Sequence, residues 1–117
     1  MRINVDLLRG ILIDVADCPF PTVRSNRSFI YPETTQGEID YHIHLLIDNG
    51  YLKGLNASSK DAPYQYLEIE LTLAGQNFLD SIADNTVWEK TKKYLKENAM
   101  DFTFKTILFV ASKFSAN

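Results

Sequence analysis

The chain has 117 residues, 45% of them hydrophobic, which suits one domain with a buried core and excludes an intrinsically disordered protein. The net charge of −3 does not favour nucleic acid as a partner, and the single cysteine, Cys18, excludes an internal disulfide. The longest apolar run, residues 107–111, is far shorter than the roughly 20 residues that span a bilayer. We therefore expect no membrane association and a cytoplasmic location.

The charge is unevenly distributed along the chain. Residues 1–85 contain 6 basic and 12 acidic side chains, whereas residues 86–117 contain 6 basic and 3 acidic ones. We expect any contact with an anionic partner to be made late in the chain or by a local patch.

The first segment with helical periodicity covers residues 4–16. Its apolar side chains recur on one stripe, and Asn4 is a suitable N-cap. Pro19 and Pro21 end the helix because proline cannot continue its hydrogen-bond ladder. Residues 22–34 are predicted to be irregular, with a short strand at Ser28–Tyr31.

A second amphipathic helix is predicted from Thr34 or Thr35 to Asn49, and Gly50 ends it. The side chains expected on its buried face are Ile39, Ile43, Leu46 and Ile47. Those expected to point outward are Tyr41, His44 and Asp48.

A hairpin is predicted to follow this helix. A strand at residues 51–55 and a return strand at residues 66–73 flank a polar loop, residues 56–65, which has the shape of a wing. Strict alternation in the return strand directs one set of side chains to the core, namely Leu67, Ile69, Leu71 and Leu73.

Three helical patterns complete the chain, at residues 72–84, 87–98 and 103–115. The last helix is predicted to be apolar nearly all round, because Phe109 and Val110 fall outside its core stripe.

Together these elements predict an α+β fold, a winged helix-turn-helix-like domain with two additional C-terminal helices. Its expected parts are a winged-helix-like domain at residues 1–85 and a helical extension at residues 86–117 that packs on the same core. Winged-helix DNA readers have a further helix before the recognition helix. Residues 17–34 leave little room for one, so it is either a single turn or the motif is degenerate.

Two stretches carry a resemblance to a known family. The first reads Tyr41-His42-x-x-Leu45-Leu46-Ile47-x-x-Gly50-Tyr51-Leu52, and the second reads Leu71-Thr72-x-x-Gly75-x-x-Phe78-Leu79-Asp80-x-Ile82-x-x-x-Thr86-Val87-Trp88-x-Lys90. They resemble an uncharacterised bacterial and prophage family, domain-of-unknown-function family 2513, over nearly the whole chain. The resemblance implies a winged-helix-like fold and an association with mobile elements. It implies no activity and no functional residues.

The predicted recognition helix is poorly suited to DNA, because it contains neither arginine nor lysine and its outer face carries carboxylates. An acidic solvated face, or a face that contacts a protein, explains it as well. The basic side chains that could reach phosphates lie in the preceding loop and near the wing. The residues predicted to contact nucleic acid are Arg24, Arg27, Tyr41, His44, Lys53 and Lys60; scattered solubilising charge is an equal interpretation of the basic ones.

No metal, cofactor or catalytic site is predicted. His42 and His44 diverge by about 200° on a helix and cannot share an ion. Asp40, His44 and Asp48 share a face, but no further histidine or cysteine pair completes a four-ligand site. His42 borders the core and is expected to be packed and hydrogen-bonded. With no paired catalytic groups, the chain is predicted not to be an enzyme.

Two functions are therefore expected. The first is a non-enzymatic nucleic-acid-binding or transcription-regulatory protein of a phage-related locus, with double-stranded DNA as its partner. The alternative is a protein–protein interaction module that kept the winged-helix scaffold and lost DNA binding. A homodimer through the C-terminal helix is a related expectation, with Phe109, Val110 and Phe114 as its interaction surface.

Overall fold

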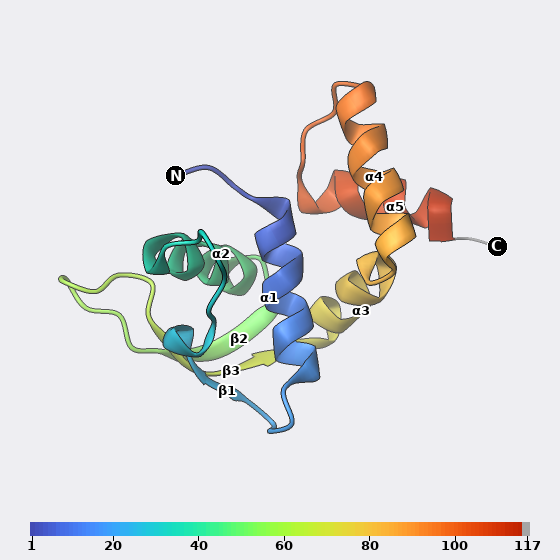
Figure 1. Cartoon of the computed structure of the whole chain (residues 1–117). Coiled ribbons are helices and arrows are strands. Elements are labelled where there is room, and N and C mark those ends of the chain that lie inside the picture. Colours follow the sequence, from blue (N-terminus) through green and yellow to red (C-terminus); the bar gives the residue numbers. More distant parts are fainter. Residues whose placement is uncertain (116–117) are drawn as a thin grey trace. The chain divides into compact units, whose positions relative to one another are not determined.

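The computed structural model describes residues 1–115, which form five α-helices and one three-stranded antiparallel sheet (Figure 1). The elements are α1 Val5–Asp17, β1 Val23–Ser25, the 3-10 turn η1 Asn26–Ser28, α2 Gln36–Asp48, β2 Leu52–Asn56, β3 Tyr66–Leu71, α3 Leu73–Ile82, α4 Asn85–Glu97 and α5 Phe104–Ser115. The sheet order is β1-β3-β2. This architecture is the predicted α+β class, is winged-helix-like, and ends in two additional helices.

The chain divides into two compact units, Met1–Gln76 and a part that begins at Asn77. The division falls within α3. The predicted boundary at residue 85, and the packing of the last helices on the same core, stay predictions.

The ends of α1 and α2 follow from side chains near the helix termini. The Asn4 side-chain oxygen accepts a hydrogen bond from the Leu7 N–H at 3.2 Å. Thr35 and Glu38 form a reciprocal capping box at the start of α2. Gly50 has a φ of +82°, and two backbone hydrogen bonds close the helix end as a Schellman motif. The predicted caps at Asn4 and Thr35 and the stop at Gly50 are confirmed.

The core of the first unit lies between α1, α2 and the inner face of the sheet. Contacts join α1 to α2 and β3, and α2 to β2. Full burial of each aliphatic side chain there contributes about 1.5–3 kcal/mol. The side chains at most 1% exposed in this core include Ile11, Leu12, Ile43, Leu46, Leu52 and Ile69.

A β-bulge interrupts the alternation predicted for the return strand. The pairing of β2 with β3 shifts register beside Gly54, and Glu68 has a φ of +51°. The bulge leaves Leu67 42% exposed, whereas Tyr66 is buried. The expectation that Leu67 lies in the core is therefore wrong. The same expectation for Leu73 is also wrong, because Leu73 begins α3 and is 79% exposed, while Ile69 is buried as predicted.

The segment between α1 and α2 contains no strand at Ser28–Tyr31, so that prediction is wrong. The strand lies earlier, at β1, where Val23 pairs with Ile69. The 3-10 turn η1 follows at once, and the Ser25 hydroxyl accepts a hydrogen bond from the Arg27 N–H at 3.3 Å. The helix that usually precedes a recognition helix is thus reduced to one turn.

The second unit contains the hairpin of α4 and α5. Asp84 caps α4 by accepting a hydrogen bond from the Val87 N–H at 2.9 Å. The inward stripe of α5 is Ile107, Val110 and Ala111. Val110 is 0% exposed, so its predicted place outside the core stripe is wrong. Within residues 1–115, no helix combines the length and apolar character needed to cross a lipid bilayer.

Asn26 is the polar centre of the first unit. It is 0% exposed and lies in the 3-10 turn η1. Its amide nitrogen donates hydrogen bonds to the Asp40 carboxylate at 2.9 Å and to the Tyr64 carbonyl at 2.8 Å, while its oxygen accepts one from the Tyr66 N–H at 3.1 Å. One side chain therefore joins η1, α2, β3 and the loop that precedes β3.

We expect Asn26→Asp to lower the free energy of unfolding by about 3 kcal/mol at pH 7, because it places a buried carboxylate beside the half-buried carboxylate of Asp40. The loss should be smaller at pH 5, since a proton shared by two carboxyls restores a donor. Urea unfolding at both pH values measures the difference from the unsubstituted chain. Asn56→Asp is the matched control, because the Asn56 side chain is exposed and its oxygen accepts from the Ser58 N–H at 2.8 Å. Equal losses in the two variants would contradict this role of Asn26.

His42 joins α2 to the start of α1, and its predicted packed, hydrogen-bonded environment is confirmed. The side chain is 1% exposed. Its Nε2 accepts a hydrogen bond from the Asn4 N–H at 2.8 Å, and its Nδ1 lies 2.7 Å from the Glu38 carbonyl oxygen. These partners fit a neutral ring with the proton on Nδ1. Burial lowers the pKa of His42, although the hydrogen bond to Glu38 opposes the shift.

This lowered pKa predicts a pH-dependent stability. The unfolded chain binds more protons than the folded one below the ordinary histidine pKa of about 6.5, so stability is full above that pH and falls as the pH decreases. We expect the urea midpoint of the unsubstituted chain to fall more between pH 7.5 and pH 5.5 than that of His42→Gln. Parallel pH profiles of the two proteins would exclude His42 as the cause.

Candidate functional site

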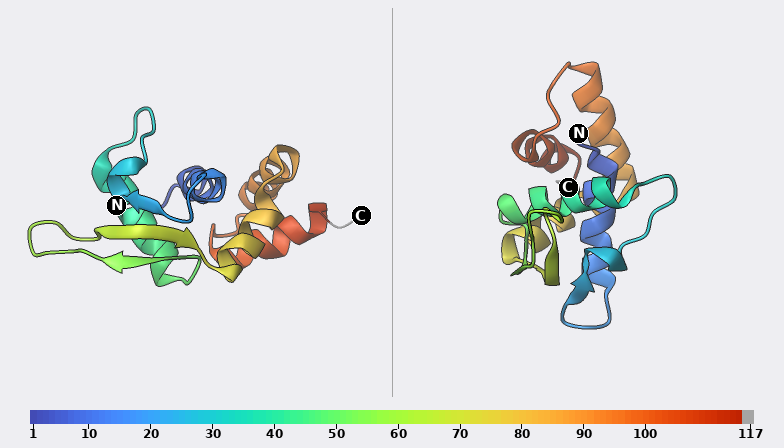
Figure 2. Two further views of the ribbon diagram at one scale, coloured as in Figure 1. Left: turned by 90° about the horizontal axis from the view of Figure 1, so that it is seen from below. Right: turned by 90° about the vertical axis from the view of Figure 1, so that its left-hand side faces the viewer.

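The outer face of α2 is partly covered by the wing, residues 57–65, which projects beyond the strands in Figure 2. The His44 ring stacks on the Tyr64 ring, with centroids 4.0 Å apart and planes 16° apart. The His44 Nδ1 lies 2.9 Å from the Tyr66 hydroxyl, whose pKa burial raises. The Gln65 amide donates a hydrogen bond to the Asp40 carboxylate at 2.8 Å. The return arm of the wing is therefore fixed to α2.

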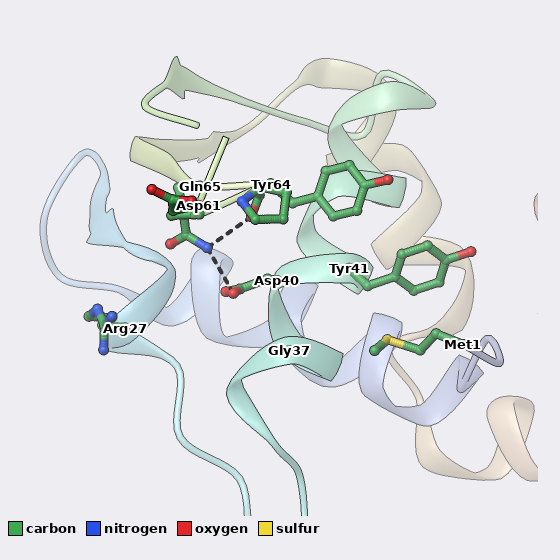
Figure 3. A pocket seen from close by; sticks show the side chains of 10 residues that line it. Met1, Arg27, Gly37, Asp40, Tyr41, Asp61, Tyr64 and Gln65 are labelled. Atoms are coloured by element: carbon green, nitrogen blue, oxygen red, sulfur yellow. Dashed lines mark hydrogen bonds between the residues drawn. The ribbon is translucent and has the colours of Figure 1, made fainter. Parts of the chain in front are cut away.

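A cleft of about 530 Å³ lies beside this contact (Figure 3). Ten residues from the chain start, η1, α2 and the wing line it. The Tyr41 and Tyr64 rings lie side by side at one end, near Met1, and Arg27 lies at the other end (Figure 3). The centroids of the Tyr41 and Tyr64 rings are 6.3 Å apart, and the planes of the two rings are inclined at 52°. We call this end of the cleft the tyrosine end.

Two carboxylates, those of Asp40 and Asp61, and the Arg27 guanidinium contribute side-chain charge to the cleft. Asp40 Oδ1 accepts hydrogen bonds from the Asn26 and Gln36 side-chain amides, both at 2.9 Å, and Oδ2 accepts the one from Gln65. These three donors are neutral, so they orient the carboxylate without cancelling its charge. Asp61 adds a second, exposed carboxylate from the wing.

The basic residues predicted to contact nucleic acid are not gathered in one cleft. Arg27 lines the cleft of Figure 3, whereas Arg24 lines a separate hollow, together with residues from the segment that precedes β1. Lys53 forms an ion pair with Glu70 at 3.1 Å. Lys60 lies exposed in the wing. Of the predicted set, Tyr41 and Arg27 share the cleft, and His44 supports it through Tyr64.

Several residues of the cleft were not predicted as site residues. They are Met1, Gly37, Asp40, Asp61, Ala62, Pro63, Tyr64 and Gln65. Asp40 shares a helix face with His44 and Asp48, which was a usable signal. No such signal exists for the wing residues. Tyr64 adopts a φ of +59°, a left-handed conformation that is uncommon for tyrosine and could not be predicted from a polar loop.

On the helix face that Asp40, His44 and Asp48 share, the first two side chains have other contacts. Asp40 accepts amide hydrogen bonds, and His44 contacts two tyrosines. Among residues 1–115, no group of three or more histidine, cysteine, aspartate or glutamate side chains is placed to hold a metal ion.

The predicted interaction surface on α5 is only partly exposed. Phe109 is 58% exposed, and the Lys113 Nζ lies 4.9 Å from its ring centre and 5.1 Å from that of Tyr94. Phe114 is half-buried and meets Tyr94 edge to face, with centroids 6.0 Å apart. Val110 is buried and offers no surface to a partner. A homodimer through this helix stays a prediction.

Comparisons with known proteins place the chain in a family. It is 28% identical over 115 residues to an uncharacterised protein of Haemophilus influenzae, and this similarity covers 95% of the chain and 92% of the relative. No solved structure matches it. Residues 2–101 match the family described as "Hypothetical protein (DUF2513)". The chain therefore belongs to the DUF2513 family, the one that its sequence motifs resemble.

Proposed function

We propose that the protein is a non-enzymatic protein–protein interaction module on a winged-helix-like scaffold, and that the cleft between α2 and the wing receives its partner. The observation that carries this proposal is the fixed wing. Asn26, Asp40 and Gln65 hold its return arm against α2, where a DNA reader would leave the helix free to enter the major groove.

The charge of the first unit supports a protein partner over DNA. Residues 1–76 contain 6 basic and 10 acidic side chains, a net charge of −4. The helix α2 itself has three carboxylates and neither lysine nor arginine. Because phosphate contacts supply most of the affinity of non-specific DNA binding, this unit is a poor electrostatic match for a duplex.

The lining of the cleft suits recognition better than catalysis. Its ten residues include no histidine, cysteine or serine, and its half-buried carboxylate is already bound by three amides. Two tyrosines and a proline give it the aromatic and apolar surface that is typical of interaction sites. The expected location is the cytoplasm.

Duplex DNA is the second candidate partner. With this partner, the protein would be a regulatory protein of a phage-related locus. The winged-helix-like arrangement favours it, together with Arg24, Arg27 and Lys60, which are exposed and form no ion pair within residues 1–115.

We expect panning of a random-peptide display library against the purified protein to enrich peptides that bind the cleft. Tyr41→Ala should weaken an enriched peptide about tenfold in fluorescence anisotropy, because it removes one aromatic wall. Phe20→Ala is the matched control, since Phe20 is 72% exposed in the same unit and does not line the cleft.

The competing function is tested in parallel with random duplex DNA at about 50 mM salt, where phosphate contacts are strong. We expect no retarded band in a gel-shift assay at micromolar protein. A retarded band that disappears as salt rises, with no peptide enriched by panning, would overturn the proposed interaction role in favour of DNA.

A further inference from the structure

We propose that the protein forms a homodimer in which the open part of β2 pairs antiparallel with β2 of a second copy, so that the two sheets become one. This inference goes beyond the proposed function, because it concerns the edge of the sheet and not the cleft. It is carried by the outward backbone groups of β2 and by two exposed leucines beside them.

The backbone of β2 is bonded to a neighbouring strand on one side only. The strand lies at an edge of the sheet, next to β3 (Figure 1). The residues that flank it, Tyr51 and Ala57, each form a backbone hydrogen bond to a residue adjoining β3, of 3.3 Å and 2.8 Å. Because the bonding side alternates along a strand, every second residue between them also faces β3. The backbone groups that face away from β3 therefore belong to Leu52, Gly54 and Asn56.

Only part of this edge is open to a partner. Leu52 is 1% exposed, so its backbone is out of reach. Gly54 is half-buried and Asn56 is exposed, and no hydrogen bond within residues 1–115 reaches their outward backbone groups. The N–H and carbonyl groups of these two residues are the template for one further strand.

The outer face of the sheet is apolar at the same place. Leu55 pairs with Leu67 of β3, and the two side chains are 64% and 42% exposed. A hollow of about 310 Å³ lies beside Leu55. Because directly opposite residues of paired strands share a face, the two leucines form a short apolar row that ends at the open edge. A strand added at this edge would remove Leu55 from water.

One antiparallel register satisfies both features. With Leu55 opposite Leu55 of the second copy, Gly54 of each copy faces Asn56 of the other, and the hydrogen bonds of these two pairs use every open backbone group. The two Leu55 residues then form a non-hydrogen-bonded pair, in which side chains approach most closely. The apolar row continues across the twofold axis and ends at Leu67 on both sides.

Neighbouring registers are less suitable. A twofold axis at Gly54 would need the backbone of Leu52, which is buried. An axis at Asn56 would need the Ser58 N–H, which already donates to the Asn56 side-chain oxygen at 2.8 Å. The register centred on Leu55 requires neither group.

The charges near the edge do not oppose this pairing. A lysine on an edge strand commonly prevents edge-to-edge association. The Lys53 Nζ, however, lies 3.1 Å from a carboxylate oxygen of Glu70 in its own chain. In the proposed register Lys53 faces Ala57 of the second copy, so no like charges lie opposite each other. The edge is thus self-complementary in backbone bonding, apolar side chains and charge, which favours a second copy over an unrelated extended segment.

Cysteine cross-linking tests the register. In a Cys18→Ser background, we expect Leu55→Cys to form disulfide-linked dimers of the full chain under mild oxidation, because non-hydrogen-bonded partners have Cα atoms about 4.5 Å apart. Lys53→Cys is the matched control on the same face of the same strand. Its two copies would be displaced by about 13 Å along the strands, which is beyond the reach of a disulfide. Equal cross-linking of the two variants would overturn the proposal.

Sedimentation velocity measures the association itself. The contact is small, so we expect a weak dimer whose population rises with protein concentration. Leu55→Lys should shift the protein to monomer, because it places like charges directly opposite each other. Ile30→Lys is the matched control, since Ile30 is 84% exposed and lies outside the sheet, and it should dimerise like the unsubstituted chain. Circular dichroism verifies that both variants are folded.

Other modes of association give different results. Dimers that persist in Leu55→Lys and disappear in Phe109→Lys would overturn the inference in favour of contact through α5. A chain that stays monomeric at the highest concentration reached would also overturn it. If display peptides then bind the unsubstituted chain and lose affinity in Leu55→Lys, the edge receives an extended segment of another protein instead.

Discussion

The burial of Asn26 is the constraint on which the rest of the first unit depends. Its amide group is inaccessible to water, so each of its three hydrogen bonds must be made within the fold. Those partners come from α2, the wing and β3. A single polar side chain in a one-turn 3-10 helix thereby performs the positioning that a full helix provides in winged-helix proteins.

This constraint changes which surface is available for recognition. A wing that is free can move into a minor groove, but a return arm bound to α2 converts the outer face of that helix into one wall of a cleft. Tyr41 therefore lines the cleft, and the His44 ring stacks on the Tyr64 ring. The cleft is concave and combines two tyrosines with two carboxylates and one guanidinium, and these features are the basis for the proposed protein partner.

Local chemistry made much of the fold predictable. Asn4, Thr35 and Gly50 act within one helical turn of where they stand, so their roles could be read from the sequence. The bulge at Glu68 could not, because it depends on pairing with Gly54 across the sheet and reverses the sides of Tyr66 and Leu67. The site was harder still. Asn26 and Asp40 are 14 residues apart, and only the tertiary fold brings the wing to them.

The left-handed backbone of Tyr64 has a consequence for how this family can vary. In the return arm, Gln65 donates a hydrogen bond to Asp40 of α2 and the Tyr64 ring stacks on His44, whereas the hydrogen bonds of the wing tip, residues 58–62, run within the wing and to Asn56 at the end of β2. Lengthening the wing at residues 58–60, which do not line the cleft, would therefore leave its return arm in place, because extra residues there are solvated and add little loop-closure entropy. Removing one residue from the return arm would instead rotate the ring away from its stacking partner. The wing can accordingly change its length away from the cleft while the contacts at its base are kept.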